Sequence, residues 1–250
     1  MPATPATDLR LVEIFSSIQG EGVLIGRRQL FVRLADCNLA CTYCDTAHAA
    51  GPTWQAEAEP GSARLLEYAN PADPPQVIRL IREWQARQPI HHSLALTGGE
   101  PLLQAEALAS WLPEAAAILP VYLETNGTLP EALATVLPWV RFISMDIKHA
   151  STSGEPTPWE AHRAFIETAG AGLCQIKLVI DVRTTGEDLT EVARFVQRHG
   201  GDVPFVLQPR TEAGRPALVG RQLLALQAAA AREHPATLLI PQTHPLLAIA

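Results

Sequence analysis

Three cysteines lie close together in the segment Cys37-Asn-Leu-Ala-Cys41-Thr-Tyr-Cys44, and the fourth, Cys174, lies far away. This spacing does not suggest a disulfide framework, and clustered thiols in a chain without a recognisable export signal more often bind metal. Three thiolates are one ligand short of a structural zinc site, unless His48 completes a Cys3His set. A cubane iron–sulfur cluster on three cysteines would instead leave one iron free to bind another molecule. The spacing favours the cluster, with zinc or buried free thiols as alternatives.

A second motif, Thr97-Gly98-Gly99-Glu100-Pro101, follows a predicted strand. Its simplest interpretation is a Gly-Gly turn before a helix. Glycines also let a ligand approach the backbone closely, and a carboxylate beside them can receive an ammonium group. Because the motif follows the cysteine loop by one strand–helix crossover, the sequence favours ligand binding here.

Short β-branched and aromatic runs predict the strands that position both motifs. The predicted strands cover residues 30–34, 93–97, 121–124, 141–145, 175–180, 205–208 and 238–240, and the predicted helices cover 74–88, 104–117, 158–169, 188–199 and 216–233. This alternation predicts an α/β fold with parallel strands, arranged as an open doubly wound sheet or as a full or partial barrel. Ligands bind at the carboxyl ends of the strands in both architectures, where the two motifs stand.

Composition limits the partners and the location. The 250 residues carry 19 basic and 26 acidic side chains, a formal net charge of −7, and no run rich in Lys and Arg. Nucleic acids and anionic membranes are bound by summed positive charge, so neither is the expected partner. No apolar stretch reaches the ~18 residues of a membrane span, and residues 1–10 do not form a signal peptide. We expect a cytoplasmic protein with one domain over residues 1–250, and an excursion from the barrel at 47–72.

The cysteine spacing resembles the signature of radical S-adenosylmethionine (SAM) enzymes. The Gly-Gly-Glu-Pro segment is similar to the one that holds the methionine amino group of SAM in those enzymes. The resemblance implies a full or partial parallel barrel of the radical SAM type. It also implies that Cys37, Cys41 and Cys44 bind a [4Fe-4S] cluster whose remaining iron is chelated by SAM. Electron transfer from the cluster then breaks a carbon–sulfur bond of SAM and yields a 5′-deoxyadenosyl radical.

Further segments narrow the resemblance to the 7-carboxy-7-deazaguanine synthases (QueE-type enzymes). They are Ile18-Gln19-Gly20-Glu21-Gly22, Phe31-Val32-Arg33-Leu34, Cys44-Asp45-Thr46, Glu124-Thr125-Asn126-Gly127, Ser144-Met145-Asp146-Ile147-Lys148, Leu207-Gln208-Pro209-Arg210 and Gln242-Thr243-His244. This family converts 6-carboxy-5,6,7,8-tetrahydropterin to 7-carboxy-7-deazaguanine with loss of ammonia, usually toward queuosine. The resemblance also implies Mg2+, a homodimer and an electron donor such as a flavodoxin.

The resemblance implies a role for each matched residue. Thr46 would bind Mg2+ through its hydroxyl group. SAM would contact Gly98, Gly99, Glu100, Asp146, Ile147, Lys148, Gln208, Pro209, Arg210 and Thr211. The substrate would be surrounded by Ile18, Gln19, Gly20, Glu21, Arg33, Thr97, His244 and the terminal carboxylate of Ala250.

Side-chain chemistry agrees with several of these roles. Arg33 can grip a carboxylate bidentately, Glu21 can accept from the donors of a pterin edge, and Gln19 presents both polarities. Simpler alternatives remain for two residues: Arg33 could pair with a surface Asp, and Thr46 could cap a helix. The tail departs from the family pattern because Pro245 follows His244 where a Lys is common, and Ala250 stands where a Pro is common.

Two other functions stay open from the sequence. Another radical SAM enzyme, such as a glycyl-radical activase that acts on a protein, would share the cysteine motif but would not need a free C-terminus. A zinc-stabilised binding module without catalysis would share only the thiols.

Overall fold

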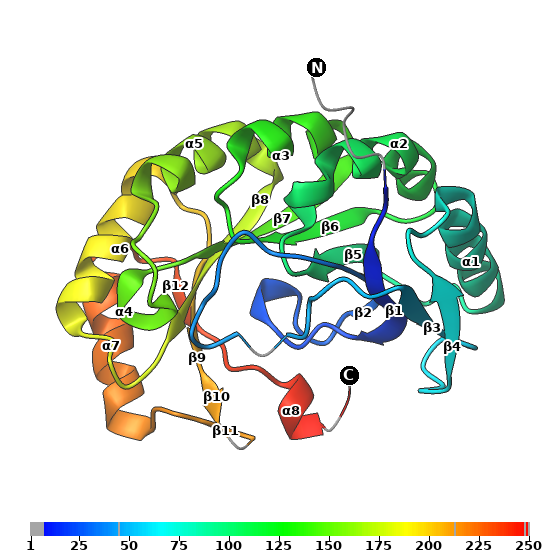
Figure 1. Cartoon of the computed structure of the whole chain (residues 1–250). Helices are drawn as coiled ribbons and strands as arrows, with labels where there is room; N and C mark the ends of the chain where they lie inside the picture. Colours follow the sequence, from blue (N-terminus) through cyan, green and yellow to red (C-terminus); the bar gives the residue numbers. More distant parts are fainter. Residues whose placement is uncertain (1–7, 45, 213, 248, 250) are drawn as a thin grey trace.

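The computed structural model describes residues 8–44, 46–212, 214–247 and 249, and Figure 1 shows the arrangement of its elements. Ten strands form one sheet in the order β12-β9-β8-β7-β6-β5-β2-β1-β3-β4. The strands are β1 (Leu11–Ile18), β2 (Arg28–Leu34), β3 (Thr53–Glu57), β4 (Leu65–Ala69), β5 (Ser93–Gly98), β6 (Val121–Thr125), β7 (Val140–Ile147), β8 (Leu173–Ile180), β9 (Phe205–Pro209) and β12 (Thr237–Leu239).

The run from β2 through β5, β6, β7, β8 and β9 to β12 is parallel throughout. Its strands are the ones that the β-branched and aromatic runs predicted. The fold is therefore a partial parallel barrel, one of the arrangements expected, and the carboxyl ends of these strands share one edge.

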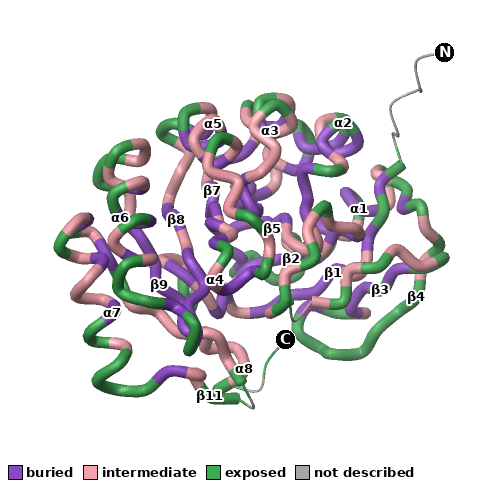
Figure 2. Tube along the Cα trace, turned by 60° about the vertical axis from the view of Figure 1, so that its left-hand side comes forward, coloured by how far each residue is buried: buried purple, intermediate pink, exposed green. Residues whose placement is uncertain are grey.

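Helices follow the strands and curve around the outer face of the sheet (Figure 1). They are α1 (Pro74–Arg87), α2 (Ala105–Ala116), α3 (Pro130–Val136), α5 (Trp159–Ala169), α6 (Gly186–Gly200) and α7 (Gly220–Glu233). In α1, Val77, Ile78, Ile81 and Trp84 are the buried residues. This spacing of three and four residues gives the helix one apolar stripe, which packs on the sheet. Buried residues concentrate along the strands and exposed ones along the outer turns (Figure 2).

The amino-terminal edge of the sheet differs from the prediction. Strand β1 was not predicted; it runs antiparallel to β2 and parallel to β3. The segment 47–72 contains β3 and β4, which pair as an antiparallel hairpin and extend the same sheet. The segment is rich in Gly, Pro and Glu, so neither strand was predicted from its composition. Strand β4 lies at the sheet edge and buries little apolar surface.

Shorter elements connect or follow these helices and strands. They are η1 (Gly22–Leu24), η2 (Pro101–Gln104), η3 (Leu137–Trp139), η4 (Gly170–Gly172), α4 (Ala150–Ser153), α8 (His244–Leu247) and the small β10 (Thr211–Glu212) and β11 (Arg215–Pro216) pair. Helix α7 begins later than predicted because Pro216 belongs to β11. In the described part of the chain, no helix has the length and apolar character needed to cross a membrane.

Candidate active site

A cavity of about 800 Å³ opens at the carboxyl ends of the parallel strands. The predicted site residues that line it are Ile18, Gln19, Gly20, Glu21, Arg33, Cys37, Cys41, Cys44, Thr46, Thr97, Gly98, Gly99, Asp146, Lys148, Gln208, Arg210, Thr211 and His244. They come from segments spread between Ile18 and His244. The fold therefore brings the residues matched to SAM and the residues matched to the substrate to one cavity. Ala250 lies outside the described residues.

The cysteine loop follows β2 and borders the cavity. Cys37 and Cys41 are half-buried, Cys44 is exposed, and all are free thiols. The loop is fixed through Thr42, whose backbone N–H donates to Ser153 O at 2.9 Å and whose hydroxyl donates to Thr152 O at 2.9 Å. Helix α4 therefore holds the loop in place without using the thiols.

The thiols fit a group that is larger than one ion. Burial raises the pKa of Cys37 and of Cys41, so thiolates at these positions call for a nearby cation such as iron. No three His, Cys, Asp or Glu side chains among the described residues converge as ligands of a single metal ion would. Three thiols on one loop that all line this cavity are a donor set that suits a cluster, in which each thiolate takes a different iron.

The turn after β5 leaves no room for side chains. A Cβ on Gly98, whose φ is 128°, would collide with the carbonyl of Leu34, and a Cβ on Gly99 would collide with that of Asp36. The two glycines let the turn pack against the backbone that leads into the cysteine loop, while their own backbone faces the cavity.

Glu100 differs from the prediction that it receives an ammonium group. Its carboxylate is fully buried and accepts from Leu102 N at 3.0 Å, Thr125 Oγ1 at 2.8 Å and Asn126 N at 2.8 Å. It is absent from the cavity lining. Because its oxygens already have donors from the chain, Glu100 braces the turn from behind.

Asp146 and Gln208 bring unsatisfied acceptors to the cavity. Asp146 Oδ2 accepts from Lys148 Nζ at 2.9 Å, whereas Asp146 Oδ1 and Gln208 Oε1 are buried without a hydrogen-bond partner in the described part of the chain. Buried acceptors without partners are costly unless a ligand supplies donors. Their neighbours Ile147 and Pro209, also predicted to contact SAM, are buried and do not line the cavity, because successive side chains of a strand point to opposite faces.

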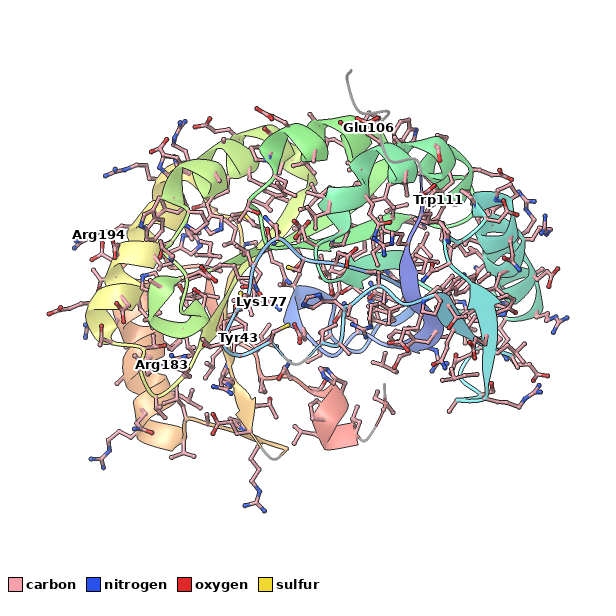
Figure 3. The ribbon with its side chains drawn as sticks, viewed as in Figure 1. Tyr43, Glu106, Trp111, Lys177, Arg183 and Arg194 are labelled. Carbon is pink, nitrogen blue, oxygen red and sulfur yellow. The ribbon has the colours of Figure 1, made fainter. Side chains whose placement is uncertain are left out.

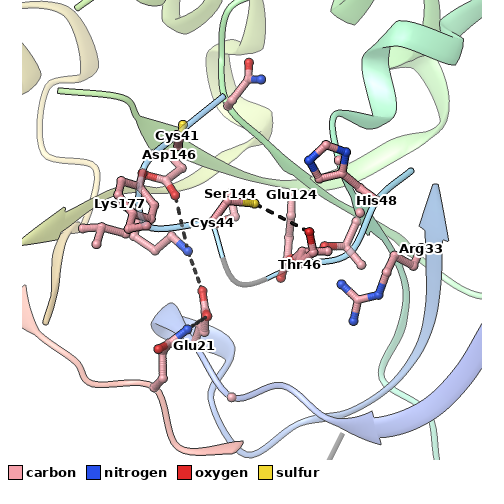
Figure 4. A pocket seen from close by; sticks show the side chains of 18 of the residues that line it. Glu21, Arg33, Cys41, Cys44, Thr46, His48, Glu124, Ser144, Asp146 and Lys177 are labelled. Carbon is pink, nitrogen blue, oxygen red and sulfur yellow. Dashed lines mark hydrogen bonds and ion pairs between the residues drawn. The ribbon is translucent and has the colours of Figure 1, made fainter. Parts of the chain in front are cut away.

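The guanidinium group of Arg33 points into the cavity (Figure 4). Its Nε donates to Glu13 Oε1 at 2.7 Å, and the group lies over the ring of Phe15, 5.4 Å from the centroid. The sequence left open an ion pair between Arg33 and a surface Asp. In the structure, the partner of Arg33 is Glu13. Because the described ion pair uses Nε, the terminal nitrogens remain available to a substrate carboxylate.

Gln19 lies at the centre of a polar network on the barrel floor. Its amide nitrogen donates to Glu124 Oε1 at 2.8 Å, and its amide oxygen accepts from Glu21 N at 3.0 Å. Thr97 donates to the other oxygen of Glu124 at 2.7 Å. Burial and the nearby charge of Glu21 raise the pKa of Glu124. The sequence did not single out Glu124 for the site, although the quoted Glu-Thr-Asn-Gly segment contains it.

The tail of the chain closes one side of the cavity. Gln242 donates to Glu21 Oε1 at 2.8 Å, and Thr243 N donates to Gly20 O at 2.9 Å. His244 lies against Gly20, and both residues line the cavity. Lys177 of β8, which the sequence did not single out, forms an ion pair with Glu21.

Thr46 lies beside the cysteine loop, and its carbonyl oxygen is 3.7 Å from the thiol of Cys44. The alternative that it caps a helix is wrong, because the described chain continues from Thr46 to β3 without a helix. Cys174 does not join the other thiols: its Sγ donates to Ile143 O at 3.1 Å, and burial raises its pKa to about 12.

Comparisons with known proteins agree with this geometry. Residues 32–196 match the sequence profile of the Radical SAM superfamily. The chain is 42% identical over 237 residues to 7-carboxy-7-deazaguanine synthase of Geobacter sulfurreducens, covering 94% of this chain and 95% of that protein. It is 31% identical over 217 residues to the synthase of Thermococcus kodakarensis, covering 80% and 83%. The crystal structure of QueE from Escherichia coli shares the fold, with a TM-score of 0.56, 18% identity and 95% of each chain covered.

The profile and the fold define a radical SAM protein. Within that superfamily, the chain belongs to the family of 7-carboxy-7-deazaguanine synthases.

Proposed function

We infer that this chain catalyses the radical ring contraction of 6-carboxy-5,6,7,8-tetrahydropterin to 7-carboxy-7-deazaguanine, with loss of ammonia, in deazapurine and queuosine biosynthesis. The observation that carries this inference is the composition of one cavity. The three thiols of the radical SAM motif and the side chains matched to the pterin, Arg33 and Glu21, line it together. The near full-length similarity to a curated synthase supports the same reaction.

Cys37, Cys41 and Cys44 would hold a [4Fe-4S] cluster, and the neighbouring part of the cavity would hold SAM. When bound, these cofactors supply a 5′-deoxyadenosyl radical that removes a hydrogen atom from C6 of the substrate. The chain's contribution is to place C6 and to exclude water and other hydrogen donors. Asp146 Oδ1 and Gln208 Oε1, the buried acceptors without partners, are suited to the hydroxyl and amino donors of SAM.

Arg33 would bind the substrate carboxylate through its terminal nitrogens, because Glu13 already fixes its Nε. Glu21 would accept from the pyrimidine edge of the pterin. Gln19, whose amide nitrogen already donates to Gln29 and Glu124, would offer its amide oxygen as a further acceptor. Glu124 is suited to hold a proton on a carboxylate oxygen during loss of ammonia, because burial raises its pKa. These roles give the two ends of the substrate different partners, which fixes its orientation.

We extend the proposal to Mg2+ at Thr46. Mg2+ takes oxygen ligands, keeps several waters and is often held by few protein groups. One threonine hydroxyl beside the cavity, together with substrate oxygens and water, matches that preference. Mg2+ would then orient the substrate carboxylate between Thr46 and Arg33, which lie on the same side of the cavity in Figure 4.

We further propose a one-electron donor such as a flavodoxin, a reducing cytoplasmic location and a homodimer. Closely spaced thiols such as those of the cysteine loop are kept reduced in the cytoplasm. The edge strand β4, on which Leu65 and Leu66 are 46% and 43% exposed on opposite faces, offers backbone pairing groups to a second copy.

The experiment is an anaerobic assay of the reconstituted protein with SAM, a reductant and carboxytetrahydropterin. We expect 7-carboxy-7-deazaguanine and ammonia in equal amounts, with SAM not consumed in proportion. Release of 5′-deoxyadenosine without the deazaguanine would reject this substrate while keeping the radical SAM class.

A further inference from the structure

Lys177 is a buried ammonium group between two carboxylates of the cavity. It lies on β8 directly beside Asp146 of β7 in the register of the sheet. Its Nζ forms an ion pair with Glu21 and lies 3.6 Å from Asp146 Oδ2, and its side chain is only 13% exposed. Figure 4 shows the ammonium between the two carboxylates, which come from opposite sides of the cavity. Figure 3 places Lys177 in the interior of the barrel.

Strand β8 holds the loop of residues 19–23 at two points. Two residues before Lys177, the side chain of Gln175 accepts from Val23 N at 2.7 Å and donates to Ser144 Oγ at 2.6 Å. Residues two apart on a strand share a face, so both side chains point into the barrel. Gln175 fixes the loop with neutral hydrogen bonds, whereas Lys177 fixes it with a charge.

The charge of Lys177 determines the state of Glu21. Burial alone would raise the pKa of Glu21, but the ammonium of Lys177 and its hydrogen bond lower it to about 2. Among the described residues, the other titratable groups that interact with Glu21 are Glu124 and Tyr122 from β6 and His244 from α8, with Asp146 from β7 behind Lys177. Of these groups, Lys177 is the permanent cation, so Glu21 depends on it.

We propose that Lys177 is a positioning residue for the substrate, because it orients the Glu21 carboxylate as an acceptor for the N–H donors of the pterin ring edge. This inference rests on the proposed function. Lys177 and Gln242 each occupy one oxygen of Glu21. A carboxylate has about four acceptor positions, so two remain for the ligand. A protonated Glu21 would present a donor and would repel the same ring edge.

A chain of charged and polar side chains connects the two ends of the cavity. Asp146 accepts from Lys148 at 2.9 Å and faces Lys177 at 3.6 Å, so one carboxylate lies between the cofactor side and the substrate side. Lys148 in turn donates to Tyr43 of the cysteine loop at 3.0 Å. The cavity therefore selects a heterocycle with a guanidine-like edge. Contacts from Lys177 through Asp146 to Lys148 position this heterocycle relative to the cofactor.

The test measures pterin affinity in the cluster-loaded, SAM-bound protein under anaerobic conditions, between about pH 5 and pH 8. We expect Lys177→Met to weaken pterin binding roughly tenfold to a hundredfold at neutral pH, the range of one charged hydrogen bond. Affinity should fall further as the pH decreases, because burial then raises the pKa of Glu21. Lys177→Arg should restore the flat pH profile of the wild type. SAM affinity should change by less than about threefold, because Asp146 keeps Lys148.

Gln175→Met is the matched control, since it removes the neutral contact of the same strand with the same loop. It should weaken pterin binding without making the binding pH-dependent. Glu21→Gln covers the case in which Lys177→Met does not fold, because Lys177 then keeps Asp146 as its partner. It should lose pterin affinity by a similar factor, independent of pH.

The possible results separate the two claims. If Lys177→Met or Glu21→Gln binds the pterin as the wild type does, with a flat pH profile, the positioning role is wrong while the proposed function stands. If the wild type binds SAM but not the pterin, the proposed function fails and this inference fails with it.

Discussion

The two sides of the cavity are built differently. On the cysteine side, Cys37 and Cys41 are free thiols, and Asp146 Oδ1 and Gln208 Oε1 have no hydrogen-bond partner among the described residues. On the opposite side, Arg33 and Glu21 already have charged partners, namely Glu13 and Lys177. The first side suits cofactors that bring their own charge, and the second is organised before a ligand arrives. Preorganised groups lose less freedom on binding, which favours precise placement of a substrate.

Removal of a thiol should have the largest effect. We expect Cys37→Ala, Cys41→Ala or Cys44→Ala to abolish product formation, because two thiolates are too few to hold the cluster. The measurement is iron and sulfide content together with turnover. Cys174→Ala is the control, since this thiol bonds to Ile143 O away from the cavity; it should retain full iron content. A Cys41→Ala protein with normal iron and sulfide would contradict the assignment.

Arg33→Lys should have the next largest effect. The substitution keeps the positive charge but removes the planar guanidinium group with its paired N–H donors. We therefore expect KM for the pterin to rise roughly tenfold to a hundredfold, with a smaller change in kcat. Steady-state kinetics under anaerobic conditions measures this split. Arg82→Lys serves as the control, because Arg82 pairs with Glu114 on an exposed helix surface. An unchanged KM in Arg33→Lys would show that the carboxylate binds elsewhere.

A prediction for Glu100 concerns stability first. Glu100→Gln replaces one acceptor oxygen by a donor in a site that already contains three donors. We expect a loss of about 1–3 kcal/mol in the free energy of unfolding, measured by urea denaturation. Glu114→Gln, on an exposed surface, should change it little. A Glu100→Gln protein of normal stability would show that the turn does not depend on this brace.

The effect that is smallest at neutral pH is a pH dependence at His162. Its Nε2 donates to Asn126 O at 3.2 Å behind the same turn, and burial lowers its pKa to about 4. The unfolded chain therefore binds this proton first. The contribution of His162 to stability is present above about pH 6.5 and is lost as the pH falls toward 4, by up to about 3 kcal/mol.

His162→Phe should flatten the dependence of unfolding free energy on pH over this range, relative to the wild type. Unfolding curves at several pH values test it. An equal slope in the two proteins would mean that His162 is not the group responsible. His48→Gln, near the cysteine loop, is a suitable control for a histidine outside this contact.

Local patterns predicted the parallel strands, because buried β-branched runs and strand-end motifs depend on neighbours in the sequence. The cysteine motif was recognisable for the same reason. Strand β1 was missed although it forms the partner of β2, since its Ser16 and Ser17 interrupt the apolar run and are buried by distant contacts. For β1, the local sequence did not show which distant residues bury these two serines.

Pairings between distant residues could not be predicted. Lys177 and Glu21 are 156 positions apart, and the only local sign was the polar alternation of Gln175 and Lys177 in a strand that otherwise reads as buried. Glu100 was assigned to a ligand because the donors that satisfy it, from Thr125 and Asn126, arrive from the next strand. A carboxylate beside two glycines does not reveal which donors reach it.

The most direct test of the account uses pterin labelled with deuterium at C6 in a single turnover with SAM and reductant. If the organised side of the cavity places C6 against the cofactor side, deuterium appears in 5′-deoxyadenosine or is returned to the product, and 7-carboxy-7-deazaguanine forms. Formation of 5′-deoxyadenosine that never carries deuterium, without the deazaguanine, would contradict the account.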